Sequence, residues 1–404
     1  MLYLTDKFFD LKNLLNPFVF FYLYQTVFCF IALAYSDIYP VEISEKLKLY
    51  IVIAYILTFF GGLTSRHLFQ RSGIHYIRYN DLILSRLPSR PFIVAGMLIF
   101  VLAILLFAYF TYKTGGIIVL GSEIENARIE RRKGAGMINL MFISFFLYGF
   151  LIVLLNKRIS FGIKSVLFII AALALLSFGS RAPFIKLLLS SFLLMGVLNI
   201  RKYTFKKYAF IGIVIIGLIV LLGALRTNLK DGVDFLDLLV ARMGWRPFVN
   251  IQNLQRIFEF FPAKHDFMYG YSYLVELKIF LPGHNPNFGT YLKDVMHWEF
   301  EGGSITPTFL GIGYINFGKA AFFIYPFLYG FLFNTIYQAL CYRARVSNLS
   351  IIFLIMFSIG ISGSLSTGLM PAIIANVLFL IFTLLVHITL RQLLSSDPLK
   401  FKWE

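Results

Sequence analysis

The stretch that decides the fold is "FGSRAPFIK", Phe178 to Lys186, which interrupts an apolar run from Ser165 to Leu198. Gly179 and Pro183 disfavour a continuous helix, so the "GSRAP" segment predicts a tight outer turn between two short membrane spans. Arg181 lies in this turn, where a charge at membrane depth costs about 2.5 to 3.5 kcal/mol and commonly marks function. The alternative is an arginine that reaches lipid phosphates from an ordinary helix end.

The composition of the whole chain agrees with a membrane location. Of its 404 residues, 59% are hydrophobic and 14% are charged, whereas soluble domains carry about 25% charged residues. The mean hydropathy is +0.78, and apolar stretches close to the roughly 20 residues that cross a bilayer recur along the sequence. These features predict an all-α polytopic membrane protein, with residues 1–404 forming a single integral membrane domain. About ten transmembrane helices are expected, near residues 17–34, 49–64, 92–112, 137–155, 163–178, 183–199, 208–225, 317–341, 349–366 and 371–390.

The basic residues between these spans predict the orientation. Short cytoplasmic loops carry an excess of Lys and Arg. With the N-terminus inside, the inner segments hold 19 such residues and the short outer loops hold few. We therefore expect both termini on the cytoplasmic side. Two longer outer segments, about 113–136 and 226–304, are also basic, which is compatible with this orientation because long loops cross regardless of their charge.

The larger outer segment shows helical periodicity. Apolar residues recur at helical spacing between Val233 and Met243. The stretches "IQNLQRIFEFFP" (251–262) and "YSYLVELKIFLPG" (271–283) are similarly amphipathic, and each reaches a proline. Such patterns predict short helices that lie on the outer membrane surface. Together they would form a large helical cap over the spans.

Several arginines are predicted at the same outer surface. Arg226 lies where the seventh span leaves the membrane, and Arg242 and Arg246 are four residues apart, so one helical turn would place both on one face. Gly244 weakens that helix, and Pro247 is expected to end it. Guanidinium groups bind phosphate oxygens in pairs and stay charged at any physiological pH. With Arg181, these residues predict a site for a lipid-linked diphosphate, although each arginine taken alone fits an ordinary surface residue.

The sequence lacks the motifs of several catalytic classes. It has no Walker-type loop and no G-x-G-x-x-G motif, so we predict no nucleotide cofactor and no synthase that uses cytosolic nucleotide sugars. The six histidines lack metal-binding spacing, and Cys29 and Cys341 lie in or beside apolar spans. No metal, disulfide or nucleic-acid partner is therefore predicted. An enzyme of this kind would use a substrate that reaches the outer face already activated.

One stretch of the sequence is similar to a known family: "GGSITPTFLGIGYINFGKAAFFIYPFLYGF", Gly302 to Phe331. It resembles the stretch that follows the large external loop in bacterial O-antigen and exopolysaccharide polymerases of the Wzy type. "GSR" at 179–181, and "GG" at 115–116 followed by Arg128, are also similar to that family. The chain departs from it at Ile312 and Gly313, where members often carry a glutamate before the aromatic residue. The matching residues are Thr306, Thr308, Gly311, Tyr314, Asn316, Phe317, Gly318 and Gly330.

The resemblance implies a multi-pass enzyme of the bacterial cytoplasmic membrane that polymerises polysaccharide repeat units for lipopolysaccharide, capsule or exopolysaccharide. It would transfer a growing glycan from undecaprenyl diphosphate to an incoming lipid-linked repeat unit, as a glycosyltransferase that needs no metal. Its partners would be that lipid-linked oligosaccharide, membrane lipids, and a chain-length regulator and a flippase. The implied diphosphate-binding residues are Arg128, Arg181, Arg226, Arg242 and Arg246.

The acceptor hydroxyl also needs a general base. His284 ranks first, because "PGHNPNFGTYL" (282–292) resembles the His-Asn motif of the related O-antigen ligases and its Gly and Pro residues predict an ordered turn. The other candidates are His265, Asp294, His297, Glu299 and Glu301. Two further functions remain open: an O-antigen ligase, which shares this chemistry, and a flippase or transporter of lipid-linked oligosaccharides. Transporters usually contain internal repeats, and none is found in this sequence.

Overall fold

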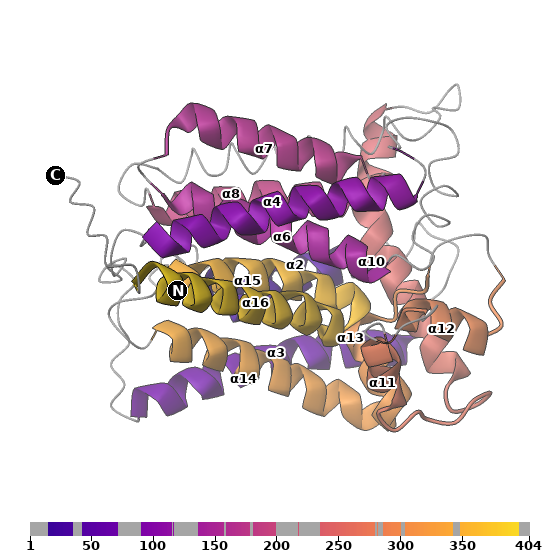
Figure 1. Cartoon of the computed structure of the whole chain (residues 1–404). Coiled ribbons are helices and arrows are strands. Elements are labelled where there is room, and N and C mark those ends of the chain that lie inside the picture. Colours follow the sequence, from indigo (N-terminus) through magenta and orange to yellow (C-terminus); the bar gives the residue numbers. More distant parts are fainter. Residues whose placement is uncertain are drawn as a thin grey trace. The chain divides into compact units, whose positions relative to one another are not determined.

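The computed structural model describes residues 15–34, 43–71, 90–114, 116, 136–156, 159–177, 181–198, 217, 235–278, 281, 286–299, 304–341 and 348–395. Every described element is a helix (Figure 1). The elements are α2 (Pro17–Ala34), α3 (Glu45–Arg71), α4 (Arg90–Lys113), α6 (Gly136–Leu155), α7 (Phe161–Leu176), α8 (Arg181–Leu198), α10 (Phe235–Phe260), α11 (Tyr271–Leu277), α12 (Phe288–Val295), α13 (Thr308–Phe317), η5 (Gly318–Ala320), α14 (Ala321–Cys341), α15 (Asn348–Thr367) and α16 (Leu369–Ser395).

Within these residues, six helices are long and apolar enough to cross a membrane. They are Glu45–Arg71, Pro91–Lys113, Met137–Leu155, Thr308–Leu340, Asn348–Thr367 and Leu369–Leu390. The prediction of an all-α polytopic membrane protein is therefore confirmed. Apart from Gly217, the predicted span at 208–225 lies outside the described residues. The total of ten spans stays a prediction, as do the cytoplasmic termini and the single domain over 1–404.

The chain divides into two compact units. The first comprises Met1–Leu82, Asn199–Ala344 and Phe357–Ala372, and the second comprises Ile83–Leu198, Arg345–Met356 and Ile373–Glu404.

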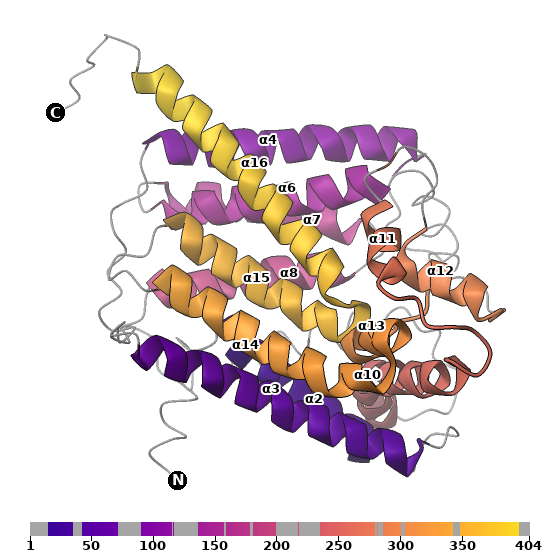
Figure 2. The same ribbon diagram turned by 90° about the horizontal axis from the view of Figure 1, so that it is seen from below.

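Helices α3 and α14 lie side by side in the first unit (Figures 1 and 2). The two backbones come so close at Gly61 and Gly330 that a Cβ atom on Gly61 would stand 2.0 Å from the backbone oxygen of Phe327. Such small residues permit close packing where lipid surrounds the helices. The amide of Asn334 adds a polar link, because its Nδ2 donates to the Gly62 oxygen at 2.9 Å.

Helices α4 and α6 form the corresponding pair in the second unit. Gly149 allows the approach, since a Cβ atom there would stand 2.8 Å from the Phe100 nitrogen and 3.0 Å from the Gly96 oxygen. Aromatic rings fill the rest of the contact, and the Phe100 and Phe146 rings meet edge to face with centroids 5.3 Å apart. Glycine and phenylalanine therefore define this interface.

The hairpin predicted from "GSRAP" differs from the observed backbone. Helix α7 ends at Leu176, and α8 already begins at Arg181, so Arg181 and Pro183 belong to the helix and only the residues before them separate α7 from α8. Proline is tolerated in a first helical turn because the N–H groups there have no partner within the helix. The proposed role of Pro183 as a helix breaker is wrong.

Residues 235–307, which we call the connecting segment, contain α10, α11 and α12. The prediction that Pro247 ends a short helix is wrong, because α10 continues through Gly244 and Pro247 to Phe260. An interior proline costs about 3 kcal/mol. The buried side chains of Phe248, Ile251 and Leu254 follow it at helical spacing, and burying each such side chain is worth about 1.5 to 3 kcal/mol, so their packing offsets the proline.

Candidate functional site

The residues that resemble the polymerase family join the connecting segment to α13 through hydrogen bonds. Thr306 precedes α13, and its Oγ1 donates to the Oδ1 of Asn250 and accepts from the Nδ2 of Asn253 at 2.9 Å. Both asparagines are buried on α10. The Nδ2 of Asn250 also donates to the Oγ of Ser366 at 2.7 Å. Buried amides need such partners because an unpaired polar group costs about 1 to 3 kcal/mol.

Asn316 holds the stretch that precedes α11. Its side chain is fully buried, its Oδ1 accepts from the Gly270 N–H at 2.8 Å, and its Nδ2 donates to the Oγ of Ser272 at 2.6 Å and to the Ile312 oxygen at 2.8 Å. Gly270 has a φ of 95°, a left-handed conformation that glycine adopts without strain. The asparagine of the family-like motif therefore fixes the start of α11.

Tyr314 and Gly318 complete this junction. The Tyr314 hydroxyl donates to the Phe261 oxygen at 2.8 Å, where the backbone leaves α10. Gly318 ends α13 with a φ of 62°, and a Cβ atom there would stand 3.0 Å from the Phe267 ring. Thr306, Tyr314, Asn316 and Gly318, which resemble the family, thus hold the connecting segment against α13.

The predicted arginine site is only partly within the described residues. Arg242 and Arg246 both belong to α10, four residues apart, and the prediction that their guanidinium groups share one face stays a prediction. Arg181 is the first residue of α8 and belongs to the second unit. Arg128, Arg226 and His284 lie outside the described residues. The convergence of these arginines on one diphosphate stays a prediction.

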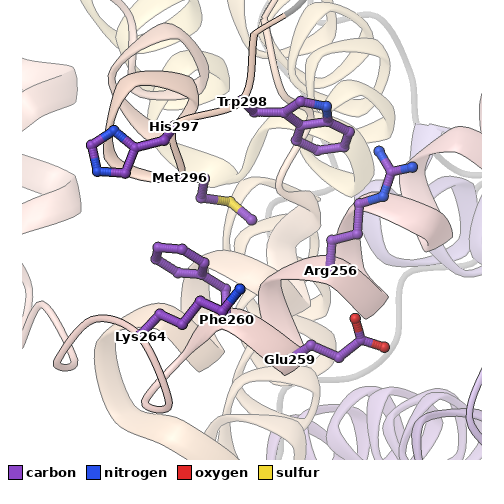
Figure 3. Close-up of a pocket in the computed structure, with 7 residues that line it drawn as sticks. All are labelled: Arg256, Glu259, Phe260, Lys264, Met296, His297 and Trp298. Atoms are coloured by element: carbon purple, nitrogen blue, oxygen red, sulfur yellow. The ribbon is translucent and has the colours of Figure 1, made fainter.

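One of the predicted bases lines a pocket of the connecting segment. The pocket has a volume of about 260 Å³. Figure 3 shows the Met296 thioether and the Phe260 ring toward its middle, with the Arg256 and Trp298 side chains on one side and His297 on the other. Its lining residues are Arg256, Glu259, Phe260, Lys264, Met296, His297 and Trp298.

The backbone at the end of α12 explains how His297 and Trp298 reach this pocket. The His297 N–H donates to the Asp294 oxygen and the Trp298 N–H to the Lys293 oxygen, both at 3.1 Å. This pair of bonds, with His297 at a φ of 50°, is the Schellman motif that ends many helices. This motif fixes the backbone from which the side chains of His297 and Trp298 project.

Helix α10 supplies Arg256 and Glu259 to the pocket. The Arg256 guanidinium carbon lies 4.0 Å from the centre of the Trp298 ring, a cation–π contact. Burial lowers the pKa of Arg256, and the nearby Glu259 carboxylate opposes that shift. The Glu259 Oε1 accepts from the Nε2 of Gln255 at 2.6 Å, and Gln255 in turn accepts from the Ser44 hydroxyl.

The remaining predicted bases are dispersed. His265 is exposed, and its Nδ1 lies 2.7 Å from the Asp266 oxygen. Asp294 and Glu299 are exposed and do not line the pocket. Glu301, like His284, lies outside the described residues. Of the six predicted bases, the structure therefore brings only His297 to the pocket.

Sequence reasoning missed Glu276 of α11. Burial raises the pKa of this carboxyl from 4.5 to about 7, partly opposed by a hydrogen bond from the Phe288 N–H at the start of α12. A carboxyl with a pKa near the working pH can act as a general base. The signal was weak, because Glu276 was read as one polar position of an amphipathic helix, and its burial depends on α12, which the sequence did not predict.

No group of three His, Cys, Asp or Glu side chains that could hold a metal occurs among the described residues. His284 and Glu301 are not among them. The predicted independence from metals therefore stays a prediction.

The fold and the junction around α13 define a polytopic helical membrane protein with a folded segment between its helices. Residues 13–370 match the family described as "Putative O-antigen polymerase". The chain belongs to this O-antigen polymerase family, whose members are glycan-polymerising enzymes that act on lipid-linked repeat units. Comparisons with curated proteins and with solved structures give no match.

Proposed function

We propose that this protein polymerises undecaprenyl-diphosphate-linked repeat units at the outer face of the bacterial cytoplasmic membrane. The observation that carries the proposal is the family match over residues 13–370, which includes the whole connecting segment and the junction around α13. The membrane-length helices supply the surroundings that a lipid-linked substrate needs.

The reaction transfers the growing glycan to the acceptor repeat unit. The acceptor hydroxyl oxygen bonds to the anomeric carbon of the donor, the bond from that carbon to the diphosphate breaks, and undecaprenyl diphosphate leaves with the electron pair. Arg128, Arg181, Arg226, Arg242 and Arg246 are proposed to stabilise the diphosphate, since preorganised donors at a developing charge contribute about 10²- to 10³-fold. No metal is invoked.

The hydroxyl proton passes to a general base in this proposal. His284 remains the first choice from the sequence, and Glu276 joins it because its raised pKa, about 7, suits proton acceptance near neutral pH. The two candidate bases predict different effects of substitution. His284→Gln should abolish the rise of activity with pH if His284 is the base, whereas Glu276→Gln should abolish it if the carboxyl is the base.

Deletion of the gene tests the proposal directly. The cells should add a single repeat unit to their acceptor and lose all longer glycans in a gel of the surface polysaccharide. A strain that adds no repeat unit at all would indicate the alternative ligase function. Accumulation of lipid-linked repeat units on the cytoplasmic side would indicate the alternative flippase function.

The variant Arg181→Lys tests the diphosphate site. Lysine keeps the positive charge but loses the planar pair of N–H donors, so we expect shortened glycans and a polymerisation rate reduced by less than the roughly 10²- to 10³-fold that loss of a whole donor costs. The measurement is glycan length in the complemented deletion strain. Full-length polymer from Arg181→Lys would mean that Arg181 only contacts lipid phosphates.

A further inference from the structure

The pocket between the ends of α10 and α12 combines an apolar middle with charged groups around it. Phe260 and Met296 supply the middle, and Trp298 adds an indole ring. Sugar rings present C–H groups on their faces and hydroxyls at their edges, so they pack on aromatic rings while charged side chains bind the hydroxyls. The arrangement suits a carbohydrate better than a wholly apolar ligand.

The size of the pocket limits the ligand to about one sugar ring. Its volume of about 260 Å³ is slightly below the roughly 300 to 1,000 Å³ of sites that hold drug-sized molecules. Both helix ends that form it are hydrogen-bonded. The Lys264 N–H donates to the Phe260 oxygen at 2.8 Å, and the Schellman motif fixes the backbone at Trp298, so the pocket is preformed and needs little ordering on binding.

The charges favour a ligand with an acidic group. Arg256 and Lys264 are two permanent cations, whereas Glu259 is the single carboxylate of the lining. Glu259 already accepts a hydrogen bond from Gln255. Neither cation makes an ion pair with a carboxylate among the described residues. Burial also removes part of the water around Arg256 and lowers its pKa, a shift that the Glu259 carboxylate only partly opposes. A second anion within reach would stabilise the guanidinium further.

We propose that this pocket binds one acidic sugar of the glycan, with the sugar ring against Phe260, Met296 and Trp298 and its carboxylate between Arg256 and Lys264. The carboxylate of Glu259 accepts from a sugar hydroxyl. This proposal rests on the proposed function, because a repeat-unit polymerase must hold glycan beside its connecting segment. The pocket would then select repeat units that contain one acidic sugar.

Intrinsic fluorescence of Trp298 tests the binding. The chain has three tryptophans, so the variant Trp245→Phe, Trp403→Phe leaves Trp298 as the only reporter. The full chain in detergent is titrated with D-glucuronic acid, with D-glucose and with inorganic phosphate at one pH and ionic strength. We expect a saturable change with glucuronic acid and binding of glucose that is about tenfold weaker or more, because glucose lacks the charge-assisted bonds.

Two lysine variants provide the matched comparison. Lys264→Ala should weaken glucuronic acid binding about tenfold. Lys319→Ala, at another exposed lysine, in η5 and outside the pocket, should leave the binding unchanged. Because Lys264 is exposed, its replacement leaves the fold intact. Equal binding of glucose and glucuronic acid, a response to phosphate with none to glucuronic acid, or an unchanged affinity in Lys264→Ala would each overturn the proposal.

The binding experiment separates this proposal from the proposed function. A deletion strain with normal glycan polymerisation would refute the polymerase, and the fluorescence titration would still measure the pocket. Loss of polymerisation in the deletion strain together with a silent Trp298 would refute the pocket alone.

Discussion

The connecting segment of the first unit and the α4–α6 pair of the second unit are held by different kinds of side chain. In the first unit, Asn250, Asn253 and Asn316 are buried and hydrogen-bonded between the connecting segment and neighbouring helices. In the second unit, Gly149 and the ring pair of Phe100 and Phe146 bring α4 against α6. A helix pair that is apolar on all sides gains association energy from close packing. A loop segment that carries polar backbone must satisfy it with partners.

These two kinds of contact respond differently to substitution. A contact built from hydrogen bonds has a defined geometry and loses it when a partner is removed, whereas a contact built from van der Waals packing tolerates exchange of similar apolar side chains. The first unit therefore positions its segment through a few identifiable residues. The α4–α6 contact of the second unit rests on the close approach at Gly149 and on packed aromatic rings.

The largest expected effect is at the closest helix approach. Gly61→Ala should unfold the first unit, because the new Cβ would stand 2.0 Å from the Phe327 oxygen and would force α3 and α14 apart. The loss should exceed the roughly 1 to 3 kcal/mol of ordinary overpacking. Gly149→Ala in the second unit meets its nearest atoms at 2.8 to 3.0 Å and should cost less. The measurement is thermal unfolding of the purified protein in detergent.

Gly162→Ala is the control for this pair, because nothing lies within 4 Å of a Cβ atom at Gly162. It should leave the unfolding midpoint unchanged or raise it slightly, since alanine is the better helix former. If Gly149→Ala destabilises the protein as much as Gly61→Ala does, the assignment of the tighter contact to the first unit is wrong.

The next effect separates polar from apolar contacts. Asn316→Leu leaves the Gly270 N–H and the Ser272 hydroxyl without their partner, at a cost of about 1 to 3 kcal/mol for each buried group that stays unpaired. We expect faster amide exchange of residues 266–278, with α4 and α6 unaffected. Phe146→Leu is the comparison variant in the second unit and should leave the exchange of 266–278 as it is.

The smallest effect concerns pH. The pKa of Glu276 is raised by burial to about 7, so the folded carboxyl keeps its proton at pH values where the unfolded chain, with a pKa near 4.5, has lost it. The contribution of this carboxyl to the free energy of unfolding is then largest below about pH 4.5, falls as the pH rises toward 7, and levels off above it. Glu276→Gln should remove this dependence while its amide oxygen still accepts from Phe288.

The measurement for this variant is the unfolding midpoint at pH 5 and pH 8, reported by Trp298 fluorescence with Trp245→Phe and Trp403→Phe present in both proteins. The midpoint of the parent protein should be lower at pH 8, and the difference between the two pH values should shrink in Glu276→Gln. Equal differences in the two proteins would mean that another group produces the pH dependence of the connecting segment.

The sequence by itself determined the class of the protein, because composition and the recurrence of apolar stretches are properties of the chain alone. It also indicated the family, because the motif residues between Thr306 and Gly330 lie in one continuous stretch of the sequence. Within the connecting segment it predicted the existence of amphipathic helices, and it placed Arg242 and Arg246 in one helix.

The tertiary structure decided what depends on partners far apart in the chain. The continuation of α10 past Pro247 follows from the buried face that comes after it, and the raised pKa of Glu276 follows from its burial with α12. The pocket joins Arg256 of α10 to Trp298 after α12. The local sequence pattern encodes the period of a helix but not the neighbouring segments that bury it. Burial by those segments is what raises the pKa of Glu276 and brings Trp298 into the lining of the pocket.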